Sequence, residues 1–263
     1  MVSEVPDSFN KNIYIAKNPT QQPQFLKKYP NFDGRGVIIG IIDSCIDVSL
    51  PGLQKTSTGL PKIIDCIDLT GNGFVNTSTI KSVDKNNILI GLTGLNLKIP
   101  LTWKNPTGEW HLGIKSIYEL FDEEAHEKII VILDCIVWNN GKEWNACLDT
   151  SFIGDLNNVK VLTNFKDCHG FGTFLNDLTF CLNIRENGNL LEIYATNTEH
   201  GSTIANICAG FYPDEPEKNG LAPGAQIISF DVWDARDGEY GSCRAITKAL
   251  QRFDYIIFIR PFS

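Results

Sequence analysis

The apolar residues of the chain fall into short runs that are separated by polar turns. The β-branched run at residues 37–42 is typical of a strand that is buried on both faces, as in a parallel sheet, and residues 63–68 form a second candidate strand. Further along, helical and strand-like runs alternate, and the expected order is helix, strand, helix, strand at 202–210, 226–232, 242–252 and 255–259. This alternation predicts an α/β fold with a parallel sheet.

The segment between about residues 52 and 195 has a different pattern, and we expect it to be a mixed α+β insert in that sheet. Residues 114–130 are expected to be helical. An Asn-Gly turn at 140–141 between two apolar runs predicts a hairpin, and residues 190–194 predict another hairpin arm.

The 263 residues are enough for one large domain or two small ones, and a composition of 43% hydrophobic and 21% charged residues allows a buried core. The polar residues 1–32 are expected to form an N-terminal arm that leads into an incomplete domain at 33–263. A net charge of −8 and scattered basic residues argue against a nucleic-acid partner, which needs clustered Lys and Arg. There is no run of 18 apolar residues and no secretory signal, so we expect no membrane contact and a cytoplasmic location.

The eight cysteines include no Cys-x-x-Cys pair, which is the spacing that many zinc and redox motifs use. Because no export route is visible, we expect reduced thiols, several of them acting as small buried side chains. Cys168 and His169 are adjacent, but two residues do not make a metal site. We therefore expect no metal and no other cofactor.

Asp43 closes the first apolar run, and catalytic groups in open α/β sheets gather at the carboxyl ends of strands. Taken alone, such an aspartate is more often a capping or turn residue. Asp47 lies four residues later and is a competitor that is less closely tied to the strand end.

His200 precedes Gly201 at the expected start of a helix, for which Ser202 or Thr203 is the expected N-cap. A helix N-terminus disfavours the imidazolium form, which suits a histidine that works as a general base. The missing side chain of Gly201 would let a substrate approach closely. Taken alone, His200 is more often a surface or cap histidine, and His111 is expected to pack between its apolar neighbours.

The combination of these motifs is more specific than either residue. An aspartate at a strand end, His-Gly-[Ser/Thr] at a helix start and Gly-x-Ala-Pro-x-Ala at 220–225 follow the order of the subtilisin triad, which is Asp, His, Ser. In that mechanism Asp43 would orient His200, and His200 would take the proton from a serine nucleophile.

From about residue 30 to 250, the sequence resembles the N-terminal part of the tripeptidyl peptidase II family of subtilisin-like (S8) serine peptidases. The long separation between Asp43 and His200 is itself characteristic of that family. Besides the triad motifs, the resemblance rests on the segments at 33–37, 62–65, 68–73, 97–100, 103–108, 134–138, 188–191 and 213–227.

The resemblance implies a subtilisin-like parallel sheet with flanking helices, and a peptidase that releases tripeptides from the free N-termini of peptide substrates. It also implies a homo-oligomer in the full-length family and acidic residues that hold the substrate ammonium group. Glu239 lies near the place expected for such an acid, although Gly241 competes for the same position.

The chain departs from the family pattern at two positions near the expected pair. Cys45 stands where the family has Gly, and it would be strained if the turn after Asp43 needs a positive φ. Ser202 and Thr203 stand where the family has Thr-His.

The chain also lacks a Gly-Thr-Ser-Met-Ala-type segment for the nucleophile and the later asparagine that helps to stabilise the oxyanion. We therefore expect a truncated lobe that is inactive by itself. The alternative is a catalytically inactive binding or assembly module derived from the same lobe. A nucleotide-binding protein is disfavoured because no Gly-x-Gly-x-x-Gly or P-loop motif follows the first strand.

Overall fold

The computed structural model describes residues 15, 17–117, 120, 131–174, 178–196, 198–233 and 243–259, with side chains as far as residue 253. Its helices are α1 (Gln22–Lys28), α2 (Phe165–Cys168), α3 (His200–Ala209) and α4 (Cys243–Ile259). Its strands are β1 (Ile38–Asp43), β2 (Ile63–Asp68), β3 (Phe74–Asn76), β4 (Thr79–Lys81), β5 (Ile88–Ile90), β6 (Asn96–Lys98), β7 (Trp110–Ser116), β8 (Ile132–Asn139), β9 (Trp144–Leu148), β10 (Gly172–Thr173), β11 (Thr179–Arg185), β12 (Leu190–Ala195) and β13 (Gln226–Asp231).

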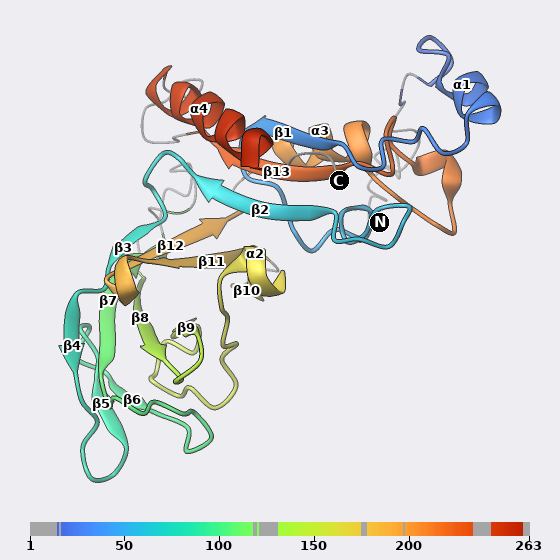
Figure 1. Ribbon diagram of the computed structural model, residues 1–263. Helices are drawn as coiled ribbons and strands as arrows, with labels where there is room; N and C mark the ends of the chain where they lie inside the picture. Colours follow the sequence, from blue (N-terminus) through green and yellow to red (C-terminus); the bar gives the residue numbers. More distant parts are fainter. Residues whose placement is uncertain are drawn as a thin grey trace, which may run out of the picture.

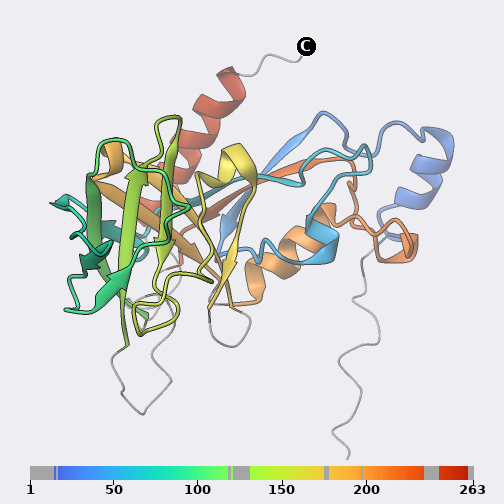
Figure 2. The same cartoon turned by 90° about the horizontal axis from the view of Figure 1, so that it is seen from below.

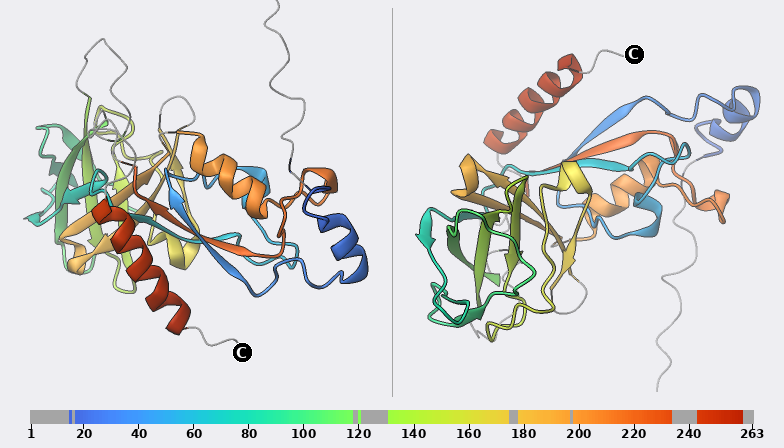
Figure 3. Two further views of the ribbon diagram at one scale, coloured as in Figure 1. Left: turned by 90° about the horizontal axis from the view of Figure 1, so that it is seen from above. Right: turned by 60° about the horizontal axis from the view of Figure 1, so that its bottom comes forward.

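A three-stranded parallel sheet in the order β1-β13-β2 forms one part of the molecule (Figure 1). Strand β1 pairs with β13 in register over its whole length, and β13 pairs with β2 after one irregularity between Ile227 and Ile228. As a result Asp43 lies beside Asp231, and Asp231 beside Asp68. Helices α3 and α4 lie on opposite faces of this sheet (Figure 3). The β-branched run of β1 is therefore covered on both sides, which explains why it does not alternate with polar residues.

Two four-stranded antiparallel sheets form the other part (Figure 2). The sheet β10-β11-β12-β3 packs one face against the sheet β4-β7-β8-β9, and Leu182 and Ile193 share a buried cluster with Val137 and Leu148. On its other face, Tyr194 belongs to the buried cluster of the parallel sheet and α3. The inserted sheet β10-β11-β12-β3 therefore lies between the parallel sheet and the second antiparallel sheet.

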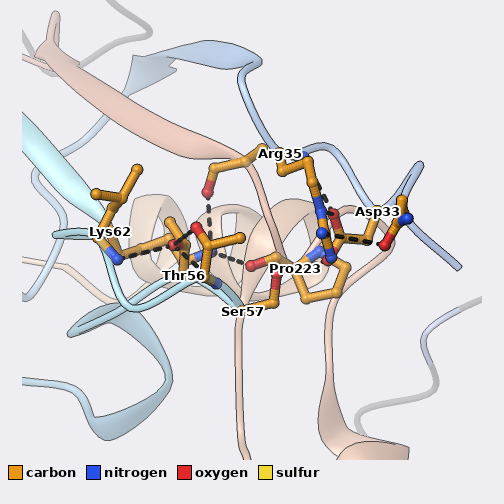
Figure 4. Close-up of polar contacts among 10 residues, drawn as sticks. Asp33, Arg35, Thr56, Ser57, Lys62 and Pro223 are labelled. Carbon is orange, nitrogen blue, oxygen red and sulfur yellow. Dashed lines mark hydrogen bonds and ion pairs between the residues drawn. The ribbon is translucent and has the colours of Figure 1, made fainter.

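A buried polar cluster joins the amino ends of the parallel strands (Figure 4). Lys62, just before β2, is fully buried, and its Nζ donates to the carbonyl oxygens of Pro223 (2.7 Å) and Ala225 (2.9 Å), just before β13. Burial lowers the pKa of Lys62 to about 8, although the negative charge of Asp33 opposes this shift. Asp33 is in turn held by an ion pair with Arg35 just before β1. The loops that begin all three strands therefore meet at this cluster.

Several predicted elements are confirmed, namely the strands near 37–42, 63–68 and 226–232, the helix near 202–210, and the hairpins around 140–141 and at 190–194. The predicted helix at 114–130 is wrong where the structure describes it, because residues 114–116 belong to strand β7. Residues 118–119 and 121–130 lie outside the described residues. The arm at 1–32, which contains α1, and the insert limits of about 52 and 195 stay predictions.

The predicted strand at 255–259 is also wrong, because helix α4 continues through these residues to Ile259. A short apolar run fits a strand or a buried helix equally well. No Gly or Pro interrupts α4 between its two ends, and a helix that has already begun adds each further residue at little cost. Among the described residues, no helix is both long and apolar enough to cross a membrane.

Candidate active site

Asp43 and His200 meet at the carboxyl edge of the parallel sheet. Asp43 is the last residue of β1, and His200 is the first residue of α3. Their side chains are joined by a hydrogen bond of 2.7 Å between Nδ1 of His200 and Oδ1 of Asp43. The carboxylate accepts the Nδ1 proton, so the lone pair of the neutral ring is on Nε2. The imidazole side chain is 70% exposed, whereas that of Asp43 is 19% exposed.

The hydroxyl of Ser44 ties the end of β1 to the start of α3. Ser44 Oγ accepts hydrogen bonds from the backbone N–H of Gly201 (3.0 Å) and from Thr198 Oγ1 (2.7 Å), and it lies 3.3 Å from Asp43 Oδ1. The backbone N–H of Ser44 donates to the same carboxylate oxygen at 2.7 Å. The carboxylate that faces the histidine is therefore itself held in place.

Gly201 is needed for this packing. It is buried, and a Cβ at this position would overlap the carbonyl oxygen of Ser44. The prediction that its missing side chain leaves room for a substrate is therefore not supported, because the space is taken by the loop after β1.

The inserted sheet holds the loop that follows Asp43. The buried hydroxyl of Tyr194 on β12 accepts a hydrogen bond from the backbone N–H of Ile46 at 2.6 Å. Thr179 on β11 donates to Asp47 Oδ1 at 2.8 Å. Asp47 is thus engaged with the insert, and its predicted competition with Asp43 for the histidine is wrong. Neither Tyr194 nor Thr179 was expected from the sequence, since both contacts join residues more than a hundred positions apart.

Ser202 lies inside helix α3 and is not its N-cap, which corrects the prediction made for Ser202 and Thr203. Glu199 occupies the N-cap position and makes no side-chain capping bond. The hydroxyl of Ser202 instead accepts a hydrogen bond from the backbone N–H of Asp47 at 2.8 Å.

Cys45 adopts no positive φ, so the strain expected there does not occur. Its side chain is buried, and the thiol donates a hydrogen bond to Asp231 Oδ2 at 3.2 Å. Burial, and then the negative charge of Asp231, raise the pKa of the Cys45 thiol well above its usual value. Cys45 is therefore a packed thiol next to the Asp43–His200 pair and not an activated nucleophile.

Other candidates lie elsewhere or outside the described residues. Glu239 and its competitor Gly241 fall in the range 234–242, which the structure does not describe. His111 packs edge-on against Trp144, with ring centroids 5.4 Å apart, as expected of a packing residue. The described residues contain no group of three or more His, Cys, Asp or Glu side chains that could hold a metal ion. The eight cysteines are free thiols.

The family model that describes the Subtilase family matches residues 34–254, which is most of the chain. The chain belongs to the subtilase family. Within this subtilase, the matched range includes both Asp43 and His200.

Named relatives of this subtilase confirm the predicted resemblance. It is 34% identical to Tripeptidyl-peptidase 2 of Caenorhabditis elegans over 93% of the chain and 22% of the relative, and 33% identical to Tripeptidyl-peptidase 2 of Oryza sativa subsp. japonica over 86% of the chain and 22% of the relative. A crystal structure of Tripeptidyl Peptidase 2 (TPP II) superposes with a TM-score of 0.72 at 21% identity, over 87% of the chain and 23% of the solved chain. The subtilisin-like fold is confirmed, and the chain spans less than a quarter of the length of these relatives.

Proposed function

We propose that this chain supplies the aspartate and the histidine of a serine peptidase triad. The observation that carries this proposal is the 2.7 Å hydrogen bond between the largely shielded Asp43 carboxylate and the exposed His200 ring. Asp43 fixes the tautomer of the imidazole and stabilises the imidazolium that forms during the reaction. His200 Nε2 takes the proton of a serine hydroxyl and later delivers it to the leaving amine.

The nucleophile belongs to a segment outside these 263 residues in this proposal. No described serine hydroxyl makes a hydrogen bond with Nε2 of His200, and Ser44 and Ser202 are engaged in holding the loop after β1. The lobe therefore orients a base, and the serine and the oxyanion donors complete the site from elsewhere.

The substrate class in this proposal is peptides with a free N-terminus, from which tripeptides are released in the cytosol. The relatives' name, tripeptidyl-peptidase 2, supports this substrate class. An acid near the site would pair with the substrate ammonium group, and Glu239 is the candidate. The complete protein is expected to be a homo-oligomer.

The test uses the natural polypeptide that carries these 263 residues and a tripeptide whose carboxyl group is joined to a fluorogenic amine. We expect cleavage of the free tripeptide amide and none of its N-acetylated form. His200→Ala should lower kcat/KM by at least about 10³-fold, because the base is lost while substrate binding remains.

The matched control is His169→Asn, which removes an imidazole at a left-handed position that Asn tolerates. It should leave kcat/KM nearly unchanged. The 263-residue chain alone should release no fluorophore. If this chain does cleave the substrate and His200→Ala abolishes the cleavage, the nucleophile lies within the 263 residues and not outside them. Full activity of His200→Ala in the natural polypeptide would contradict the proposal as a whole.

A further inference from the structure

A cleft of about 680 Å³ lies where α4 faces β2 and the ends of β11 and β12. Its lining does not include Asp43 or His200, and it combines apolar residues with four basic side chains. The lining residues are Ile67, Asp68, Leu69, Thr70, Gly71, Phe74, Arg185, Leu190, Glu192, Arg244, Ala245, Lys248 and Arg252. So many cations around one hollow stand out in a chain whose net charge is −8.

The two carboxylates in the lining of the cleft, Glu192 and Asp68, already accept hydrogen bonds from other groups of the protein. Glu192 is fully buried, and its Oε2 accepts a hydrogen bond from Arg185 Nε at 2.7 Å, while its Oε1 accepts the backbone N–H of Asp68 at 2.8 Å. Asp68 accepts the backbone N–H groups of Thr70 (2.7 Å) and Gly73 (2.8 Å). Arg185 and Glu192 thus neutralise each other, and Asp68 is directed at its own loop.

The three cations of α4 have no such partner. Arg244, Lys248 and Arg252 are exposed, and among the described residues no hydrogen bond or ion pair holds their head groups. Of these three cations, Arg252 interacts electrostatically with the carboxylate of Asp65. Burial raises the pKa of Asp65, and the positive charges of Arg252, Lys166 and Arg185 oppose that rise. The wall that α4 presents to the cleft therefore keeps a net positive charge.

The spacing of these cations fits an extended peptide. Residues four apart on a helix are separated by about 6 Å along its axis, so Arg244, Lys248 and Arg252 form a row about 12 Å long. In an extended strand, alternate side chains point the same way and are about 6.6 Å apart. Successive acidic side chains of such a strand can therefore meet successive cations of α4.

The remaining side of the cleft favours the same ligand. Phe74 is 42% exposed, and together with Leu190 it offers an apolar surface. The side chains of an extended strand that point away from α4 would contact this surface. A phosphate cradle is disfavoured because the backbone N–H groups of Thr70, Gly71 and Gly73 all donate to Asp68 and do not converge on the cleft.

We propose that this cleft binds an extended peptide segment in which acidic residues alternate with apolar ones. The acidic side chains pair with Arg244, Lys248 and Arg252, and the apolar side chains contact Phe74 and Leu190. The inference does not depend on the peptidase activity, because the cleft shares no lining residue with the Asp43–His200 pair.

The test measures fluorescence anisotropy of a labelled eight-residue peptide of alternating Glu and Leu, added to the full 263-residue chain. A peptide with four Glu followed by four Leu has the same composition and charge but the wrong spacing. We expect the alternating peptide to bind at least about tenfold more tightly, and we expect salt to weaken its binding because exposed ion pairs are screened.

The decisive variant is the triple change Arg244→Glu, Lys248→Glu and Arg252→Glu, which should lower the affinity by at least about tenfold. The matched control reverses three exposed lysines elsewhere, Lys27, Lys55 and Lys142, and should lower it by less than about threefold. Circular dichroism checks that both variants fold. If the triple Glu variant does not fold, the neutral changes Arg244→Gln, Lys248→Gln and Arg252→Gln replace it.

Three results would overturn the proposal. Equal loss of affinity in the triple α4 variant and in the control variant would show that binding responds to net charge alone. Equal binding of the two peptides would contradict the spacing argument. Displacement of the peptide by tripolyphosphate at equal charge concentration would assign the cleft to small anions instead.

Discussion

At the scale of single residues, the Ser44 hydroxyl organises the meeting of Asp43 and His200. It accepts two hydrogen bonds from the α3 side, one of them from the buried backbone N–H of Gly201, and it contacts the carboxylate on the β1 side. Because Gly201 N–H has this hydroxyl as its acceptor, removing the hydroxyl leaves a buried donor unsatisfied, which is costlier than the loss of an exposed hydrogen bond.

We expect Ser44→Ala to lower the free energy of unfolding by about 1–3 kcal/mol, as measured by urea denaturation. Ser78→Ala is the matched control, since Ser78 is exposed and its hydroxyl bonds only the neighbouring Asn76, and it should change stability by less than about 0.5 kcal/mol. Equal stability of the two variants would mean that Ser44 does not join strand and helix.

Gly201→Ala tests how closely α3 approaches the loop after β1. The added methyl group would overlap the Ser44 carbonyl oxygen, so the helix start must shift, and we expect a loss of about 1–3 kcal/mol in urea denaturation. The matched control is Thr203→Ala, at an exposed position of the same helix. Wild-type stability of Gly201→Ala would show that the helix has room to move.

The sequence predicted Asp43 and His200 because each stands at the end of a periodic element, where a local pattern can be read. It could not predict the roles of Ser44, Tyr194 or Thr179, because their partners are distant in the chain and no local pattern marks them. The sequence singled out Gly201, but it did not show why the position needs glycine. The helix packs on a backbone carbonyl that only the fold brings there.

At the scale of elements, strand β12 of the inserted sheet supports the loop next to the Asp43–His200 pair. The hydroxyl of Tyr194 bonds both the backbone of Ile46 and the Ser229 hydroxyl on β13, each at 2.6 Å. One side chain of the insert therefore contacts both the loop after β1 and the central strand of the parallel sheet.

We expect Tyr194→Phe to destabilise the fold by about 1–3 kcal/mol, because the Ile46 N–H and the Ser229 hydroxyl lose a buried partner. A double-mutant cycle with Ser229→Ala, measured by thermal or urea denaturation, should give a coupling of at least about 0.5 kcal/mol. Additive effects of the two changes would contradict a shared network.

The elements that the sequence predicted correctly are those with turn residues at both ends, such as the strand after Gly36 and the hairpin around Gly141. The predicted helix at 114–130 was wrong at its start, residues 114–116, and the predicted strand at 255–259 was wrong as a whole. Each of these stretches is too short for its period to decide between helix and strand. In each case the neighbouring element decided the outcome, since β7 pairs with β8 and α4 extends an existing helix.

At the scale of the whole molecule, the buried amine of Lys62 links stability to pH. Its pKa of about 8 in the folded protein lies below the 10.5 of a free lysine side chain. Between these two values the unfolded chain binds a proton that the folded protein does not bind, so this residue makes the fold more stable as pH rises.

We therefore expect the free energy of unfolding of the wild type, relative to Lys62→Met, to increase from pH 8 to pH 10, by at most about 1.4 kcal/mol per pH unit. The buried cysteines act in the opposite direction above pH 9, because their pKa values are raised in the fold, but they are present in both proteins and cancel. Urea denaturation at several pH values measures the difference. A constant difference would show that Lys62 keeps its ordinary pKa.

The pairing of β1 with β13 joins residue 38 to residue 226, and both antiparallel four-stranded sheets lie between them in the sequence. Hairpins such as β8–β9 and β11–β12 pair close neighbours in the chain and can form early, whereas contacts between distant residues form late. These hairpins should therefore form before the parallel sheet closes. Asp43 and His200 then come together only in the last step, so a partly folded chain has no oriented base.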